Sequence, residues 1–243
     1  MKNVLVTGAT GGIGMAIVKA FAKNGYNVAV HTFSKMQKAE ALCTELLQNF
    51  GIKATAVCAD VSKKSEVDTM MKEISSKLGD VDVLVNNAGI SQIKMLCDVT
   101  EDEWDRMFSV NVKGAYLCTN AVTSGMVHNK WGRIINISSV WGVCGASCEV
   151  HYSASKSALV GFTKALAKEL APSGITVNCV CPGLIDTQMN NHLSNEEVAD
   201  IVSDIPVGRI GLPEDVANAV MFFSDEKNSY VTGQILNVDG GWI

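Results

Sequence analysis

Tyr152 and Lys156 are four positions apart at the start of an apolar stretch that favours a helix, so we expect both side chains on one helical face. A phenol is a weak acid near neutrality, with a pKa of about 10. A neighbouring ammonium favours the ionised phenol and so lowers that pKa. Such a pair can give a proton to an oxygen that is gaining negative charge, such as a carbonyl oxygen during reduction.

Ser139 supports this interpretation, because a tyrosine and a lysine at this spacing also occur together by chance. It lies thirteen residues before Tyr152 and directly follows the apolar run Arg133–Ser138, which predicts a strand. A hydroxyl at that position can donate a hydrogen bond to a developing oxyanion. The sequence therefore predicts a proton-transfer site that contains Ser139, Tyr152 and Lys156.

A glycine-rich turn follows the first apolar run and reads Thr7-Gly8-Ala9-Thr10-Gly11-Gly12-Ile13-Gly14. Glycines permit a tight turn in which backbone N–H groups and the next helix N-terminus can meet a pyrophosphate. The turn stands between an expected strand and an expected helix, as a dinucleotide site requires. We expect cofactor contacts from Gly8, Thr10, Gly12, Ile13 and Gly14.

The end of the second expected strand bears on the choice of cofactor. An NAD site usually has an acidic residue there, about 20 residues after the glycines, to bind the ribose. This chain has Thr32 at that point, followed by Phe33, Ser34 and Lys35, and no carboxylate. Ser34 and Lys35 either donate to a 2′-phosphate or are ordinary solvated loop residues. The sequence favours NADP(H) over NAD(H).

Short apolar runs alternate with helical patterns along the whole chain. Near-continuous apolar strands suit a parallel sheet that is covered on both faces. We expect one Rossmann-like α/β domain over residues 1–243, a doubly wound parallel sheet of seven strands with helices on both faces. The strands are expected at Asn3–Thr7, Asn27–Thr32, Lys53–Ala59, Val81–Asn86, Arg133–Ser138, Thr176–Val180 and Gln234–Val238. The less regular segment 184–210 is expected to form a mobile substrate lid.

The whole chain resembles the classical short-chain dehydrogenase/reductases. The residues that carry the resemblance are Thr7-Gly8-x-x-x-Gly12-x-Gly14, Asp60-Val61, Asn86-Asn87-Ala88-Gly89, Asn111, Ser139, Tyr152-x-x-x-Lys156, Pro182-Gly183 and Thr187.

The resemblance implies a role for each of these positions. Asn111 would complete a catalytic tetrad through a water that relays protons to Lys156, and Lys156 would also bind the nicotinamide ribose beside Tyr152. The further implied cofactor contacts are Asp60, Val61, Asn87, Ala88, Gly89, Pro182, Gly183, Ile185 and Thr187. The resemblance also implies a homo-tetramer.

Two groups of ketoreductases are similar to this chain in different segments. The tail Tyr230–Gly241 and the segment 206–209 resemble the 3-oxoacyl-[acyl-carrier-protein] reductases, whose substrate is linked to a carrier protein. The segment Ser139–Tyr152 resembles the reductases that act on the 5-aminopentanone group of elongation factor P. Within it, Trp141 and Glu149 are expected to line the substrate mouth.

The charge of Glu149 bears on the choice between these substrates. A carboxylate suits a cationic amino ketone better than an anionic carrier arm, although Glu149 can equally be a solvated loop acid. Basic residues that could dock a carrier protein are sparse, namely Lys130 and Arg133. A broad-specificity alcohol dehydrogenase and a non-catalytic NADP(H) sensor stay open as further alternatives.

Composition narrows the range of partners. The formal net charge is −5, and the three arginines, Arg106, Arg133 and Arg209, are too few for a nucleic-acid-binding face. No apolar run approaches the roughly 20 residues needed to cross a bilayer, and the N-terminus has no signal-peptide pattern. No C-x-x-C pair occurs among the eight cysteines, and we expect no metal site. A cytoplasmic protein without membrane or nucleic-acid partners is expected.

Overall fold

The computed structural model describes residues 1–190 and 193–243. In this part of the chain, seven parallel strands form one sheet in the order β3-β2-β1-β4-β5-β6-β7. The strands are β1 (Asn3–Val6), β2 (Asn27–Thr32), β3 (Ala54–Cys58), β4 (Val83–Asn86), β5 (Gly132–Ile137), β6 (Ile175–Pro182) and β7 (Ile235–Val238). The predicted doubly wound α/β sheet is confirmed, and each strand boundary lies within two residues of its expected position.

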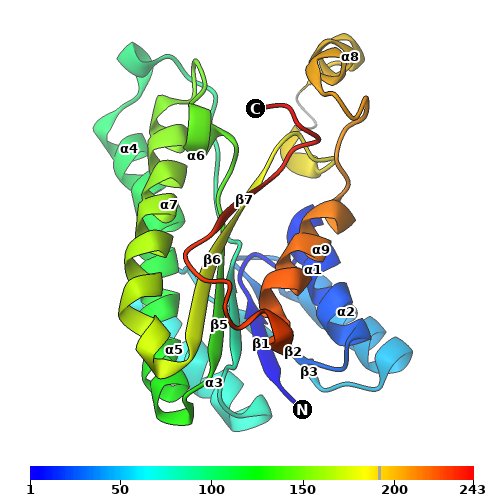
Figure 1. Ribbon diagram of the computed structural model, residues 1–243, viewed down its shortest axis with the longest axis vertical. Coiled ribbons are helices and arrows are strands. Elements are labelled where there is room, and N and C mark those ends of the chain that lie inside the picture. Colours follow the sequence, from blue (N-terminus) through cyan, green and yellow to red (C-terminus); the bar gives the residue numbers. More distant parts are fainter. Residues whose placement is uncertain (191–192) are drawn as a thin grey trace.

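Helices cover the sheet in two layers (Figure 1). One face packs against α1 (Gly12–Lys23), α2 (Met36–Phe50) and α9 (Pro213–Ser224), and the other against α3 (Lys64–Leu78), α5 (Gly114–Asn129) and α7 (Val150–Leu170). The central strands are buried on both sides; β1, for example, is buried along its whole length. Burial on both faces is the reason why the strands are nearly continuous apolar runs.

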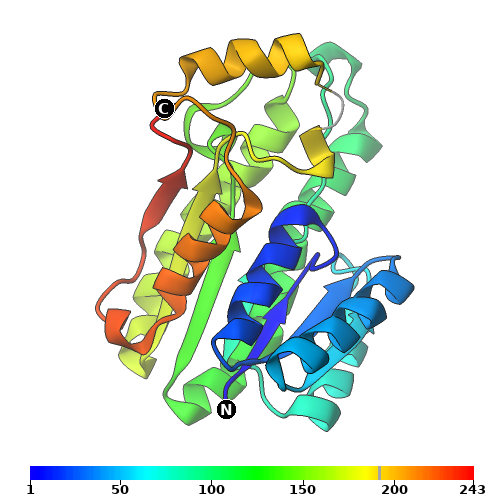
Figure 2. The same cartoon turned by 90° about the vertical axis from the view of Figure 1, so that its right-hand side faces the viewer.

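The carboxyl ends of the strands face the functional end of the molecule. The strand order reverses between β1 and β4, and a doubly wound sheet opens a ligand crevice at such a point. Three shorter helices gather at this end, α4 (Glu101–Phe108), α6 (Trp141–Cys144) and α8 (Asn195–Asp204) (Figures 1 and 2). The C-terminus also lies there, whereas the N-terminus lies at the opposite end.

A π-helical turn, Ser109–Lys113, joins α4 to α5. Such a turn inserts an extra residue into the helix and often marks a functional position. Asn111 lies in this turn and is 1% exposed. Sequence periodicity does not reveal this local change in helical geometry.

The expected lid, residues 184–210, runs over the carboxyl ends of the strands, and its residues 191 and 192 lie outside the described part. The described portions contain the short helix Gln188–Asn190 and α8, which crosses the top of the molecule in Figure 2. Its ends are anchored, because Leu184, Ile185 and Ile205 are buried and Ile185 forms a bridge with Gly211. A mobile substrate lid over residues 184–210 stays a prediction.

No helix in the described residues has both the length and the apolar character needed to span a membrane.

Candidate active site

A cavity of about 640 Å³ opens at the carboxyl ends of β1, β4, β5 and β6. Most of the residues singled out from the sequence line it together. They are Gly8, Gly12, Ile13, Gly14, Asn87, Ala88, Gly89, Ser139, Trp141, Glu149, Tyr152, Lys156, Pro182, Gly183, Ile185 and Thr187. The others, Thr10, Thr32, Ser34, Lys35, Asp60, Val61 and Asn111, do not line this cavity.

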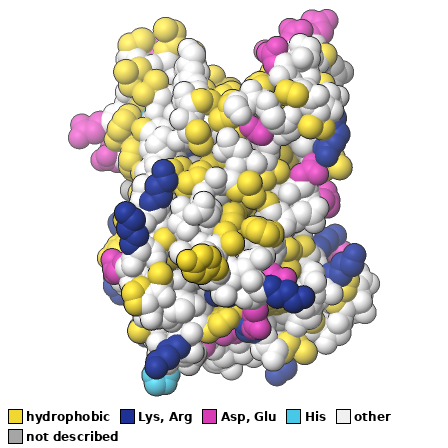
Figure 3. All heavy atoms as spheres, in the orientation of Figure 1, with side chains coloured by type: hydrophobic (Ala, Val, Ile, Leu, Met, Phe, Trp, Pro, Cys, Tyr) yellow, Lys and Arg dark blue, Asp and Glu magenta, His cyan; other side chains and the backbone are white. Residues whose placement is uncertain are grey.

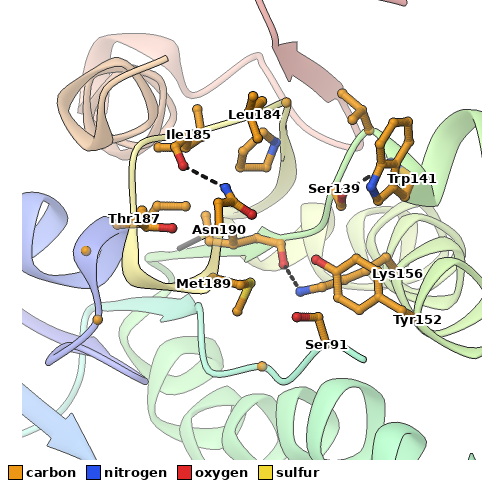
Figure 4. Close-up of a pocket in the computed structure, with 18 of the residues that line it drawn as sticks. Ser91, Ser139, Trp141, Tyr152, Lys156, Leu184, Ile185, Thr187, Met189 and Asn190 are labelled. Atoms are coloured by element: carbon orange, nitrogen blue, oxygen red, sulfur yellow. Dashed lines mark hydrogen bonds between the residues drawn. The ribbon is translucent and has the colours of Figure 1, made fainter. Parts of the chain in front are cut away.

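Tyr152, Lys156 and Ser139 converge on one wall of the cavity (Figure 4). Tyr152 and Lys156 lie one turn apart in α7, and the Lys156 Nζ is 5.7 Å from the centroid of the Tyr152 ring. The Lys156 Nζ donates to the backbone oxygen of Ile137 at 2.9 Å, and the Ser139 Oγ accepts from the backbone N–H of Trp141 at 3.1 Å. These contacts hold the ammonium and the hydroxyl at the end of β5.

The pKa of Tyr152 corrects one expectation. Burial raises it to about 12; the hydrogen bond with Ser139 lowers it, and the charge of Glu149 raises it further. Lys156 was expected to lower this pKa, but the pKa is raised instead, because burial penalises the charged phenolate. Burial also lowers the pKa of Lys156, to about 8. The raised pKa favours the protonated phenol of Tyr152, the form that can donate a proton.

Asn111 lies behind Gly89 rather than in the cavity wall. Its Nδ2 donates to the Ile90 oxygen at 2.9 Å and to the Ser155 Oγ at 3.0 Å, while its Oδ1 accepts from the Ile90 N–H at 2.8 Å. A Cβ atom at Gly89 would be 3.3 Å from both the Asn111 Oδ1 and the Lys156 Nζ. Asn111 and Lys156 therefore flank the same glycine, which must stay small to leave room for both.

The glycine-rich turn forms a backbone cradle that leaves no space for a side chain at Gly8, Gly12 or Gly14. Gly8 has a φ of +64°, and a Cβ atom at Gly14 would be 2.5 Å from the Gly8 oxygen. A Cβ atom at Gly12 would be 2.8 Å from the Thr187 Cγ2, so Thr187 rests directly on the start of α1. Asn87 ties β4 to the turn by donating from Nδ2 to the Thr7 oxygen at 2.8 Å. This narrow cradle at a helix N-terminus fits a dinucleotide pyrophosphate.

The end of β2 forms a separate polar region beyond the turn. The Thr32 Oγ1 is 3.1 Å from the Thr10 Oγ1 and accepts from the Lys35 N–H at 3.1 Å, and Ser34 and Lys35 are exposed. Sequence reasoning missed Lys38, in α2, whose Nζ donates to the Thr10 oxygen at 2.8 Å. Its spacing within α2 offered no signal, because this contact depends on how α2 packs beside the turn.

Asp60 and Val61 lie at the end of β3. The Asp60 Oδ1 accepts from the Ser62 Oγ at 2.6 Å, and its Oδ2 is 3.4 Å from the Arg106 Nη1. Val61 is 5% exposed and packs against Gly114. Asp60 is therefore held in a small polar network, and Val61 offers little free surface.

The part of the cavity around Trp141 combines aromatic, aliphatic and acidic side chains. The rings of Trp141 and Trp242 are 5.0 Å apart, and Glu149 lines the same cavity. Met189 and Ile201, from the segment over the site, add apolar surface. Trp242 was missed from the sequence, because nothing local indicates that the next-to-last residue returns to the loop after β5.

Comparisons with known proteins agree on the family. Residues 8–243 match the family model described as Enoyl-(Acyl carrier protein) reductase. The chain is 43% identical to the uncharacterized oxidoreductase YmfI of Bacillus subtilis over 241 residues, covering 99% of this chain and 98% of that protein. It is also 43% identical to the 3-oxoacyl-[acyl-carrier-protein] reductase FabG of Staphylococcus epidermidis, with the same two coverages.

The chain belongs to the short-chain dehydrogenase/reductase family. A solved structure, the 3-oxoacyl-[acyl-carrier protein] reductase of Brucella melitensis, superposes with a TM-score of 0.93 at 36% identity, covering 100% of this chain and 91% of that one. This short-chain dehydrogenase/reductase is accordingly an NAD(P)-dependent oxidoreductase. The expected family is confirmed, and the non-catalytic sensor is disfavoured.

Proposed function

We propose that this short-chain dehydrogenase/reductase is an NADPH-dependent ketoreductase that reduces a ketone to a secondary alcohol. The observation that carries the proposal is the convergence of the Tyr152 phenol, the Ser139 hydroxyl and the Lys156 ammonium on one cavity wall, beside the glycine cradle. The residues that would hold the dinucleotide are those of the cradle, with Asn87, Ala88, Gly89, Pro182, Gly183, Ile185 and Thr187.

The roles of the polar residues follow from their chemistry. When bound, the dinucleotide supplies the hydride that reduces the carbonyl carbon. Tyr152 donates its proton to the carbonyl oxygen, and Ser139 donates a hydrogen bond to the same oxygen. Lys156 favours loss of the Tyr152 proton through its charge and binds the nicotinamide ribose. Asn111, held by Ile90 and Ser155, positions a water that relays a proton towards Lys156.

The preference for NADPH rests on the end of β2. No carboxylate stands at Thr32, and the exposed Ser34, Lys35 and Lys38 can meet a 2′-phosphate. Titration should give a lower Kd for NADPH than for NADH. Lys38→Ala should raise the Kd for NADPH several-fold, which is the scale of an exposed ion pair. The Kd for NADH should change by no more than about twofold. Equal Kd values for the two dinucleotides in the unmodified protein would contradict the preference.

The first candidate substrate is a 3-oxoacyl group on a carrier protein. It is supported by the relatives from Staphylococcus epidermidis and Brucella melitensis, which carry that name. One sequence expectation about docking is corrected, however. Arg133 is 1% exposed and stacks under Trp131 at 4.6 Å, so of the two basic residues considered for a carrier only Lys130 is exposed.

The second candidate is a ketone that bears a positive charge, such as the 5-aminopentanone group of elongation factor P. It is favoured by Glu149, which lines the cavity close enough to Tyr152 to raise the pKa of that phenol. The first turns of α4 and α8 add further acids, Glu101, Asp102, Glu196 and Glu197. Figure 3 shows acidic side chains on the projecting tip of the molecule formed by α8. These charges suit a cation better than an anionic carrier arm.

One substrate panel separates these candidates. NADPH consumption is followed with acetoacetyl thioesters, simple ketones and amino ketones of matched length. Preference for the thioester supports the first candidate and preference for the amino ketone the second. Equal rates with all three indicate a broad-specificity enzyme. No turnover with any of them would contradict the ketoreductase proposal.

We also propose a cytoplasmic homo-tetramer. Large apolar side chains are exposed on α5, on α9 and on the edge strand β7, namely Tyr116, Phe222 and Leu236. Exposed apolar surface of this kind often marks a subunit interface. Light scattering after gel filtration tests the assembly.

A further inference from the structure

His31 is a buried histidine whose ring bridges the glycine-rich turn and the third strand. It is 1% exposed, in β2. The Gly8 N–H donates to the His31 Nδ1 at 2.9 Å, and the His31 Nε2 is 3.0 Å from the Ala59 oxygen. A backbone N–H can only donate, so Nδ1 must be unprotonated, and Nε2 must carry the proton that it donates to Ala59.

The same residue also holds the next amide of the turn. The His31 backbone oxygen accepts from the Ala9 N–H at 2.8 Å, so two successive N–H groups of the turn bind to one residue. Gly8 lies in the left-handed region, and its own oxygen accepts from the Gly11 N–H at 3.1 Å. The shape of the turn therefore depends on where the Gly8 N–H is held.

The charge state of the ring decides whether this bridge exists. Burial lowers the pKa of His31, while the Ala59 hydrogen bond and the Asp60 charge raise it. The charged groups around the turn are Asp60, the Arg106 that pairs with it at 3.4 Å, and Lys38, which donates to the Thr10 oxygen. In a protonated ring the His31 Nδ1 also carries a hydrogen, which would face the Gly8 N–H. The hydrogen bond between Gly8 and His31 would then be lost, and the two N–H groups would repel each other.

We propose that His31 is a positioning residue for the dinucleotide cradle, in which a neutral ring with its proton on Nε2 accepts from Gly8 and fixes the turn that receives the pyrophosphate. This inference rests on the dinucleotide site proposed above. It adds a residue with no contact of its own in the cavity, acting through the backbone of Gly8.

The first experiment tests the bridge in the protein without any dinucleotide, so it does not depend on the proposed function. Long-range ¹H–¹⁵N spectra of the imidazole nitrogens are compared for the unmodified protein and His31→Asn. The signals lost in the variant belong to His31. They should show a proton on Nε2 and an acceptor at Nδ1. A proton on Nδ1 at neutral pH would overturn the proposal.

The second experiment measures the Kd of NADPH and of NADH, with and without the acceptor. His31→Asn keeps an acceptor near the Nδ1 position, whereas the similarly sized His31→Leu removes it. A lost buried hydrogen bond is worth roughly a fivefold to tenfold change in binding. His31→Leu should raise the Kd of both dinucleotides by that factor. His31→Asn should leave both Kd values within about twofold of those of the unmodified protein. His128→Asn, at an exposed position in α5, is the matched control.

Acid supplies an independent readout. Because burial lowers the pKa of His31 from its ordinary 6.5, the affinity of the unmodified protein for both dinucleotides should stay level from about pH 8 to about pH 6.5 and fall only at lower pH, as His31 is protonated. His31→Asn, which has no titrating group there, should lose less. The 2′-phosphate of NADPH also takes up a proton in this pH range. NADH lacks this phosphate, so the change of its Kd with pH reports on the protein alone.

The outcomes separate the two proposals. If the unmodified protein binds neither dinucleotide, the proposed function fails, while the spectra still test the bridge. If His31→Leu binds as tightly as the unmodified protein, or His31→Asn is weakened as much as His31→Leu, the positioning role is wrong. If His31→Leu does not fold, the spectra and the His31→Asn titrations still decide.

Discussion

The two ends of the cavity are built differently. At the proposed dinucleotide end, the glycine-rich turn is held by hydrogen bonds with the buried His31 of β2 and with Asn87, which follows β4. At the proposed substrate end, the side chains of Trp141 and Glu149 come from the segment after β5, and that of Trp242 comes from the C-terminal end of the chain. The first end is a fixed arrangement of backbone groups, and the second is an arrangement of side chains.

This difference explains how much each end reveals about its ligand. A backbone cradle requires particular glycines, and the pyrophosphate that it binds is common to all nicotinamide dinucleotides, so a motif suffices to recognise it. The substrate end needs only a suitable shape and charge, which many side chains can supply. The class of reaction can therefore be inferred from sequence motifs more easily than the identity of the ketone substrate. Five predictions test this contrast, the largest effect first.

Tyr152→Phe removes the proton donor where the two ends meet. Turnover should fall by about 10² or more, the scale of general acid catalysis, while the Kd for NADPH stays within about twofold. Steady-state kinetics and dinucleotide titration measure the two effects. Tyr26→Phe is the matched control, since Tyr26 packs against Phe21 outside the cavity. Unchanged turnover in Tyr152→Phe would rule out the proposed mechanism.

Gly14→Ala tests the rigidity of the cradle. The new Cβ atom would be 2.5 Å from the Gly8 oxygen and 2.8 Å from the Ala9 Cα, both backbone atoms that cannot move away cheaply. We expect a loss of about 1–3 kcal/mol in unfolding free energy, with weaker binding of both dinucleotides.

Gly161→Ala is the control for this substitution. Gly161 lies within α7, and a Cβ atom there meets nothing within 4 Å. Stability should rise by about 0.5–1 kcal/mol, because alanine favours a helix over glycine. Denaturant titration compares both variants, and equal effects would show that the cradle tolerates side chains.

The buried Lys156 predicts the pH dependence of the reduction. Burial lowers its pKa from 10.5 to about 8. Its positive charge is nearly complete only well below pH 8 and is lost as the pH rises through about 8, so kcat/KM for reduction should fall roughly tenfold per pH unit at higher pH. The arginine in Lys156→Arg keeps its positive charge at high pH, so the fall in kcat/KM should move to higher pH. A flat profile to about pH 10 would contradict the assigned role.

Stability should change in the opposite direction in the same range. The unfolded chain holds the Lys156 proton up to its ordinary pKa of 10.5, while the folded chain loses it near 8. Between these values the unfolded state binds more protons, so the Lys156 contribution to the unfolding free energy rises with pH. Denaturant titrations of the unmodified protein and Lys156→Arg isolate this contribution. A loss of activity without a loss of stability then excludes unfolding as its cause.

Glu149→Gln probes the substrate end and has the smallest expected effect. Reduction of an amino ketone should slow by up to roughly fivefold, the value of a partly exposed charge pair, and a neutral ketone of equal length should be unaffected. An anionic acyl thioester should react faster, and added salt should shrink both differences. Equal effects on charged and neutral ketones would make Glu149 an ordinary loop acid.

The local features of this protein could be predicted from its amino-acid sequence. Alternating apolar runs and helical patterns gave all seven strands in order, because strand and helix periodicities depend on near neighbours. The spacing of Tyr152 and Lys156 placed both on α7 for the same reason. The glycine-rich turn could be recognised because a backbone cradle excludes side chains at fixed positions.

Which distant residues meet, and how their surroundings change their properties, depends on the three-dimensional fold. Trp242 reaches Trp141, Lys38 reaches Thr10, and His31 reaches Gly8, because the order of the strands and the packing of α2 bring them together. The pKa of Tyr152 rises although a lysine lies one turn away. Its desolvation depends on every element that closes over the ring, and sequence spacing does not record that burial.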